Sequence, residues 1–152
     1  MTRKVNFYLI NLIVVFSFLI SCKNKDVRTD NFRHYLDTNY KIDIADSTHY
    51  YLVITTFGGC ESCITTLLDS VKSKDILFNT TVIISSSGIN KNMDLELLAN
   101  KPNIMWEKRS EVSRSKIGIK SPTLLITQYQ RIIDIIHIKP SNIDSVFILL
   151  NF

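Results

Sequence analysis

The chain has no internal repeats and no low-complexity tracts, and its 152 residues include only three cysteines, three prolines and four glycines. A composition of 45% hydrophobic and 21% charged residues is typical of a single globular domain of ordinary size. Nowhere do lysines and arginines form a cluster interleaved with aromatic residues, which is the pattern that nucleic-acid binding favours. We therefore expect no nucleic-acid partner.

A long apolar run occurs near the amino terminus and extends almost without interruption from Val5 to Ile20. Arg3 and Lys4 precede this run and polar residues follow it, which is typical of a secretory leader. The sequence Leu-Ile-Ser-Cys at positions 19–22 resembles a bacterial lipobox, in which the leader is cut before the cysteine and that cysteine is lipidated. Acyl chains on Cys22 would bury many methylenes in a bilayer and give a stable anchor. We expect residues 1–21 to be a lipoprotein signal peptide.

An uncleaved membrane anchor is the alternative reading of the same run. Its sixteen residues are just short of the usual spanning length, and Asn6 and Asn11 weaken it. Either reading leaves the rest of the chain tethered to a membrane and facing the periplasm or the outside of the cell. Removing the leader also lowers the net charge from +4 to about +2.

Cys60 and Cys63 remain as an isolated pair in the stretch TTFGGCESC. A disulfide between them would close so short a loop that it would remove little entropy from the unfolded chain, so a structural role is a poor explanation. A zinc site needs four ligands, and only His34, His49 and His137 are left to complete one. The pair is better explained by redox chemistry, and we expect neither a metal nor an organic cofactor.

The polar segment that follows the lipobox has no clear apolar period. We expect residues 22–47 to be a tether and a peripheral segment, with a short strand around Tyr40 to Ile44. The domain proper is then expected at residues 48–152.

Hydrophobic patterns within this domain predict alternating strands and helices. The expected strands are 50–57, 81–85, 104–106, 123–127 and 131–138, and the last two form a hairpin. The expected helices are 61–74, 93–100 and 141–152, the last of them begun by a capping box of Ser141 and Asp144. This order predicts an α/β sandwich with a mixed central sheet.

The cysteine pair is expected on the first turn of a helix that follows a buried strand. Unpaired N–H groups at a helix start stabilise a thiolate, so the pKa of Cys60 should fall below that of a free thiol, although the charge of Glu61 opposes this. Cys60 is therefore the expected nucleophile, and Cys63, one turn further on, the resolving thiol. Gly58 and Gly59 would leave Cys60 open to a bulky partner.

A second candidate site is the dipeptide Ser121-Pro122, immediately before the first strand of the hairpin. Proline lacks an N–H and holds the preceding residue extended. Ser121 could then offer backbone groups to an extended substrate segment.

The sequence C-E-S-C at a strand-to-helix junction, together with Ser121-Pro122 about sixty residues later, resembles the thioredoxin fold family. The resemblance covers about Thr48 to Phe152 and implies a three-layer sandwich. It also implies a cis Ser121–Pro122 bond that faces the cysteines and keeps metal from bridging them. With its leader, the chain looks most similar to the tethered thiol-disulfide oxidoreductases of bacterial envelopes. Their expected partners are cysteine-containing envelope proteins and a membrane electron donor.

Two positions depart from the family's pattern. Gly59 replaces the aromatic residue that commonly precedes the first cysteine, and Ile54 replaces an acidic residue that is often buried six positions before it. These departures keep a second hypothesis open, in which a lipoprotein of thioredoxin fold binds or assembles a partner without turnover.

Overall fold

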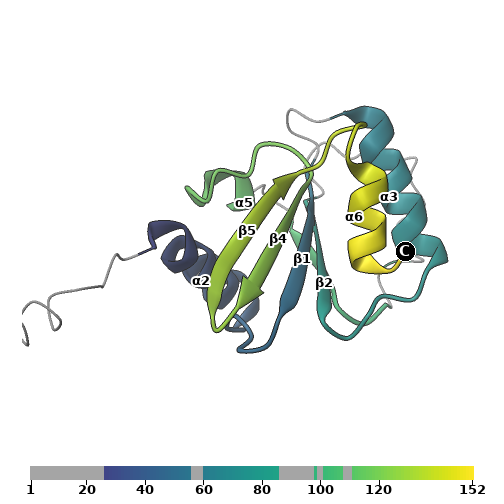
Figure 1. Ribbon diagram of the computed structural model, residues 1–152. Helices are drawn as coiled ribbons and strands as arrows, with labels where there is room; N and C mark the ends of the chain where they lie inside the picture. Colours follow the sequence, from purple (N-terminus) through teal and green to yellow (C-terminus); the bar gives the residue numbers. More distant parts are fainter. Residues whose placement is uncertain (1–25, 56–59, 86–97, 99–100, 108–110) are drawn as a thin grey trace, which may run out of the picture.

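The computed structural model describes residues 26–55, 60–85, 98, 101–107 and 111–152, and Figure 1 shows them as helices packed around one sheet. The expected signal peptide and Cys22 lie outside these residues. In the described part of the chain, no helix has the length and apolar character needed to cross a membrane. The elements, in chain order, are α2 (Val27–Tyr40), β1 (His49–Ile54), α3 (Glu61–Ser73), β2 (Thr80–Ser85), β3 (Ile104–Glu107), α5 (Glu111–Arg114), β4 (Thr123–Gln128), β5 (Arg131–His137) and α6 (Ile143–Leu150).

The sheet has five strands in the order β3-β2-β1-β4-β5, with β1 at its centre. β1 pairs in parallel with β2, and β2 with β3, whereas β4 runs antiparallel to both β1 and β5. Every residue of β2 is buried, as expected for a strand that is covered on both faces. The predicted α/β architecture with a mixed sheet is confirmed.

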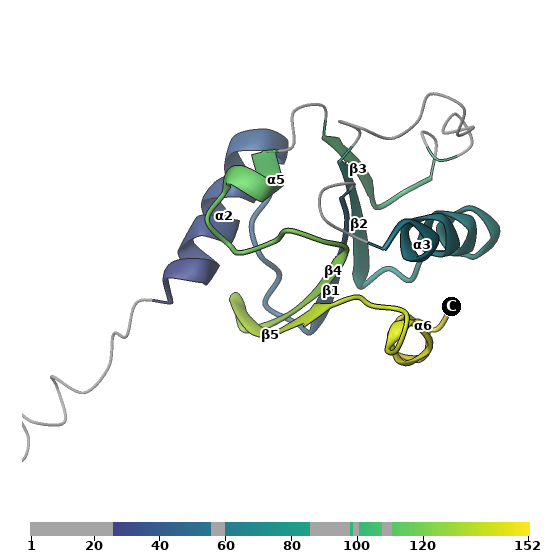
Figure 2. The same cartoon turned by 90° about the horizontal axis from the view of Figure 1, so that it is seen from above.

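Helices cover both faces of the sheet, and Figure 2 shows α3 and α6 on one side of it and α2 and α5 on the other. The α3 side holds one apolar core, to which the helix contributes the stripe predicted from its 3.6-residue period. The stripe consists of Ile64, Leu67, Leu68 and Val71. α6 adds Val146 and Leu150 to the same core.

The opposite face is covered by α2, which corrects the prediction of a tether and peripheral segment for residues 26–47, whereas residues 22–25 lie outside the described part of the chain. Phe32 and Leu36 are completely buried in a second core, and the ring of Phe32 packs edge-on against that of Tyr51 with centroids 4.9 Å apart. The predicted strand around Tyr40 to Ile44 is also wrong. Tyr40 ends the helix, and Lys41 follows in the left-handed conformation with φ 58°.

The start of α2 is fixed by Asp26, whose carboxylate accepts a hydrogen bond from the Arg28 N–H at 3.2 Å. The Thr29 hydroxyl donates to the same carboxylate, and this bond is the main reason that the pKa of Asp26 is lowered. Such capping satisfies N–H groups that the first helical turn leaves without a partner.

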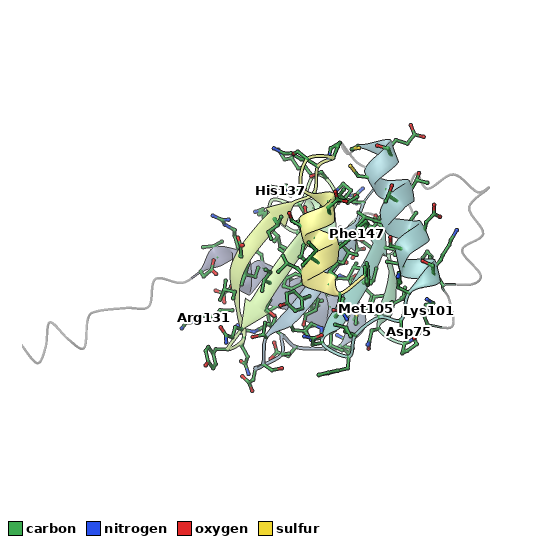
Figure 3. The ribbon with its side chains drawn as sticks, turned by 45° about the vertical axis from the view of Figure 1, so that its right-hand side comes forward. Asp75, Lys101, Met105, Arg131, His137 and Phe147 are labelled. Atoms are coloured by element: carbon green, nitrogen blue, oxygen red, sulfur yellow. The ribbon has the colours of Figure 1, made fainter. Side chains whose placement is uncertain are left out.

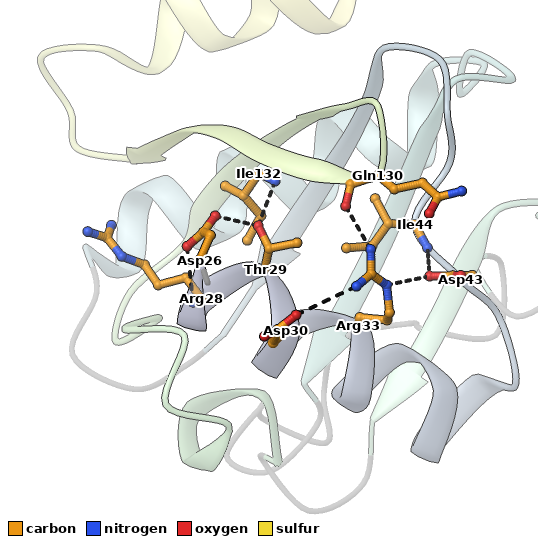
Figure 4. A network of polar contacts seen from close by, with 9 residues as sticks. All are labelled: Asp26, Arg28, Thr29, Asp30, Arg33, Asp43, Ile44, Gln130 and Ile132. Carbon is orange, nitrogen blue, oxygen red and sulfur yellow. Dashed lines mark hydrogen bonds and ion pairs between the residues drawn. The ribbon is translucent and has the colours of Figure 1, made fainter. Parts of the chain in front are cut away.

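Residues of α2 also bond to the edge of the sheet, as Figure 4 shows. The Thr29 hydroxyl accepts from the Ile132 N–H at 3.0 Å, and the Arg33 guanidinium donates to the Gln130 carbonyl at 3.0 Å. An exposed edge strand presents backbone groups to which another chain could pair. The helix thus occupies part of the edge that β5 would otherwise present.

The β4–β5 hairpin and the strand-to-helix units follow the predictions closely. The hairpin turns through Tyr129 and Gln130, which both have positive φ (51° and 58°), as a two-residue type I′ turn requires. The helix predicted at 61–74 is α3, and the strands predicted at 81–85 and 104–106 are β2 and β3. The helix predicted at 93–100 lies outside the described residues except for Leu98, which is helical and buried.

The predicted capping box of α6 is not formed. The helix begins after Asn142, and no side chain caps it. The side-chain amide of Asn142 bonds to the turn before the helix. It accepts from the Lys139 N–H at 2.7 Å and donates to the His137 carbonyl at 3.0 Å. This places the chain's last helix directly after β5.

The carboxyl end of α3 is held by Lys101, which Figure 3 labels at the lower end of that helix. Its amino group donates to the carbonyls of Val71, Lys72 and Lys74 at 2.7–2.8 Å. A cation at this position satisfies carbonyls that lack helical partners and interacts favourably with the helix dipole.

Candidate active site

Cys60 is the N-cap residue of α3. Its backbone is extended (φ −68°, ψ 112°), and its sulfur accepts a hydrogen bond from the Cys63 N–H at 3.2 Å. The Ser62 hydroxyl lies 2.8 Å from the same sulfur. The thiol therefore occupies the place in which a serine or aspartate side chain usually caps a helix, with two groups able to donate to it.

The two thiols are both free, but their surroundings differ. Cys60 is half-buried, whereas Cys63 is only 2% exposed. Hydrogen bonds with the Cys63 side chain, the Ser62 hydroxyl and the Cys63 N–H lower the pKa of Cys60. Burial, followed by the hydrogen bond to Cys60 and its charge, raises the pKa of Cys63 to about 11.

The lowered pKa agrees with the assignment of Cys60 as the nucleophile. The thiolate is the reactive form of cysteine, so the half-buried sulfur is both the more ionised and the more accessible of the two. The main influence that opposes these hydrogen bonds is the partial burial of the sulfur, rather than the predicted charge of Glu61, and the hydrogen bonds outweigh it, so the pKa of Cys60 is lowered.

Ser121 and Pro122 lie at the end of the sheet where β1 runs towards α3. Antiparallel pairing sets Val53 opposite Thr123, so the residues that precede Thr123 lie beside the last residues of β1. The resemblance to the thioredoxin fold family implied a cis Ser121–Pro122 bond, and this is wrong, because no described peptide bond is cis. Trans is the more stable form of an X–Pro bond unless packing selects the other, and here the buried Pro122 continues the hairpin, with its carbonyl accepting from the Ile138 N–H at 2.8 Å.

The carbonyl that Ser121 was expected to offer to a substrate is already bonded. It accepts from the Thr123 hydroxyl at 2.8 Å, and that hydroxyl also lies 3.1 Å from Nδ1 of His137. Because a hydroxyl has one proton, His137 must be the donor in the second contact. One of the two lone pairs of the Ser121 carbonyl is therefore engaged within the protein.

A buried carboxylate is present near this end of the sheet, on the far face. Glu107 ends β3, is 4% exposed and accepts from the Val112 N–H at 2.7 Å. Burial is the main reason that its pKa is raised. Met105, two residues earlier, packs in the α2 core, so Glu107 also points to that face, away from α3. On the α3 side, the residue six positions before Cys60 is Ile54, which is buried in the other core.

The histidines lie apart from the cysteine pair. His49 begins β1, at the end of the strand opposite to α3, and its Nε2 lies 2.9 Å from the Thr81 hydroxyl. Burial lowers its pKa. Within the described ranges, no three side chains of histidine, cysteine, aspartate or glutamate form a group that could hold a metal ion.

Ser62 is the site residue that sequence reasoning missed. The available signal was a hydroxyl residue in the first turn of the predicted helix, two positions after the expected nucleophile.

No protein-family model, no curated protein and no solved structure matches the chain.

Proposed function

We propose that the chain is a thiol-disulfide oxidoreductase of thioredoxin-like fold, lipid-anchored through Cys22 and acting on cysteine-containing proteins of the cell envelope. The observation that carries this proposal is the asymmetric pair at the start of α3, where a half-exposed Cys60 with lowered pKa caps the helix above a buried Cys63. A structural pair would not need one thiol activated and the other protected.

The fold supports the same reading. β1, α3 and β2 form a parallel strand–helix–strand unit, and the β4–β5 hairpin joins β1 antiparallel before α6 closes the chain. A thioredoxin-like core would consist of these elements, with α2 and β3 as additions on one face and one edge. Pro122 lies at the same end of the sheet as the start of α3, although its peptide bond is trans.

The proposed reaction transfers two electrons from the protein to a client. The Cys60 thiolate attacks one sulfur of the client disulfide, forms a mixed disulfide and releases the client's other sulfur as a thiolate, which takes up a proton. Cys63 then loses its proton and attacks Cys60. This forms the Cys60–Cys63 disulfide and releases the second client thiolate. A membrane electron donor would return the pair to the reduced state.

Assays on the full chain in detergent test this proposal. The wild type should accelerate the reduction of insulin disulfides by dithiothreitol, and Cys60→Ser and Cys63→Ser should each lose that acceleration. Cys63→Ser should also accumulate mixed disulfides with envelope proteins, visible on non-reducing gels, because its Cys60 can attack but cannot be resolved. Cys60→Ser is the matched control and should trap none.

The second candidate function, partner binding without turnover, is favoured by one observation. The Ser121–Pro122 bond is trans, which departs from the cis bond that the resemblance to thiol-disulfide oxidoreductases implies. Complementation of a deletion strain by the double variant Cys60→Ser/Cys63→Ser would support binding alone. Failure of that variant, combined with trapping by Cys63→Ser, would exclude it.

A further inference from the structure

The Ser62 hydroxyl is arranged differently from the other hydroxyls that bond along α3. Thr65, Thr66 and Ser73 each donate to the carbonyl four residues earlier, at 2.8–3.2 Å. Ser62 lies in the first turn, where no helical carbonyl is four residues behind it. Its hydroxyl lies instead 2.8 Å from the sulfur of Cys60.

The protonation state of Cys60 fixes the direction of this hydrogen bond. A thiolate carries no proton, so the Ser62 hydroxyl must donate whenever Cys60 is ionised. The Cys63 N–H donates to the same sulfur at 3.2 Å. Hydrogen bonds to a charged acceptor are roughly twice as strong as those between neutral groups, so both donors favour the thiolate.

Oxidation removes the charge that makes the hydrogen bond strong. In a Cys60–Cys63 disulfide the sulfur of Cys60 is neutral, and neutral sulfur is a weak acceptor. A donor that stabilises only the reduced state shifts the equilibrium of the pair towards the dithiol.

We propose that Ser62 sets the reduction potential of the Cys60–Cys63 pair by donating its hydroxyl to the Cys60 thiolate in the reduced state alone. The inference rests on the proposed redox function and adds the residue that tunes it. With serine at this position the reduced pair is a weaker electron donor to client disulfides than it would be with alanine, and its disulfide is more readily reduced by the membrane donor.

The effect of Ser62 can be separated from its place in the helix. The side chain of Ser62 is exposed, and alanine is the better helix former, so Ser62→Ala should fold at least as well as the wild type. Ser62→Thr keeps the hydroxyl. Thr65→Ala removes another exposed hydroxyl of the same helix, one that bonds only to the Glu61 carbonyl.

The test equilibrates the full chain in detergent with a series of reduced and oxidised glutathione. In the measured reaction the protein disulfide and two glutathiones give the dithiol and one glutathione disulfide, and alkylation of the free thiols followed by mass spectrometry reports the fraction reduced. For Ser62→Ala we expect an equilibrium constant about fivefold less favourable to the dithiol, which corresponds to a potential lower by ~20 mV. The pH at which Cys60 is half alkylated should rise in the same variant. Ser62→Thr and Thr65→Ala should match the wild type in both measurements.

Two results would overturn the inference alone: Ser62→Ala behaving as the wild type in both measurements, or Thr65→Ala shifting as far as Ser62→Ala. A third result concerns the wild type before any variant is compared. If it forms no Cys60–Cys63 disulfide at any glutathione ratio, the proposed function fails, and this inference fails with it.

Discussion

Cys60 and Cys63 are three residues apart, yet their sulfurs are in opposite electrostatic surroundings. The first receives hydrogen bonds that favour its charged form, whereas the second is buried beside the first and keeps its proton to a pKa of about 11. When the reduced pair loses one proton, the negative charge therefore resides on Cys60, the more accessible of the two sulfurs.

This asymmetry predicts two separate pH profiles for thiol alkylation. Only the thiolate reacts with iodoacetamide, so each rate rises with pH up to the pKa of its thiol. Cys60 should reach half its maximal rate below the free-thiol value of about 8.5, and Cys63 only near pH 11. Mass spectrometry of the labelled peptides assigns each rate. The same chain in denaturant is the control, in which both profiles should coincide; coincident profiles in the folded protein would contradict the activated Cys60.

At the residue scale, sequence could identify the thiols and could not describe their partners. A cysteine pair after a buried strand locates a helix start from pattern alone, because the period of the following residues changes to that of a helix. The contact between Ser62 and Cys60 depends on a rotamer, and the trans bond before Pro122 depends on how the hairpin packs. Neither leaves a periodic signal in the sequence.

At the scale of elements, sequence reasoning missed the short helix α5 and also the much longer helix α2. Most residues of α2 are polar or charged, and its apolar face consists only of Phe32, Tyr35 and Leu36, which recur at i, i+3 and i+4. Asp26 is a regular N-cap for it. The apolar stripe is narrow, so the average polarity of the segment favoured a tether.

Phe32→Ala tests whether α2 is part of the core. Phe32 is fully buried against Tyr51, so its truncation should lower the free energy of unfolding by about 3 kcal/mol, as is usual for a buried phenylalanine. Val27→Ala is the matched control on the same helix. Its side chain is 63% exposed, and the change should stay within about 0.5 kcal/mol. Urea unfolding measures both, and equal, small effects would mean that the helix is peripheral.

At the scale of the whole molecule, each face of the sheet needs its own layer of helices. Sequence predicted the α3 and α6 layer, because the strong periodicity of these helices follows directly on neighbouring strands. The second layer joins residues far apart in the chain, since Phe32 and Leu36 share a core with Ile83 and Leu125. Long-range packing of this kind cannot be read from local patterns.

The two layers predict that residues 48–152 do not form an independent domain. Without α2 the sheet would lose the burial of Phe32, Tyr35 and Leu36, worth roughly 5–9 kcal/mol together, which is comparable to the whole stability of a domain. A fragment of residues 48–152 should bind the dye ANS and unfold without cooperativity, whereas residues 26–152 should unfold in one sharp transition. A well-packed 48–152 fragment that binds no dye would contradict this division of the core.

The start of α2 at Val27 also bears on where the protein could act. If the chain is anchored at Cys22 as proposed, three residues separate Cys22 from the Asp26 cap, and the four residue steps between them span at most about 14 Å. So short a tether would keep the folded domain close to the bilayer surface and restrict its rotation. The disulfides within its reach would be those that other proteins carry close to the same membrane surface.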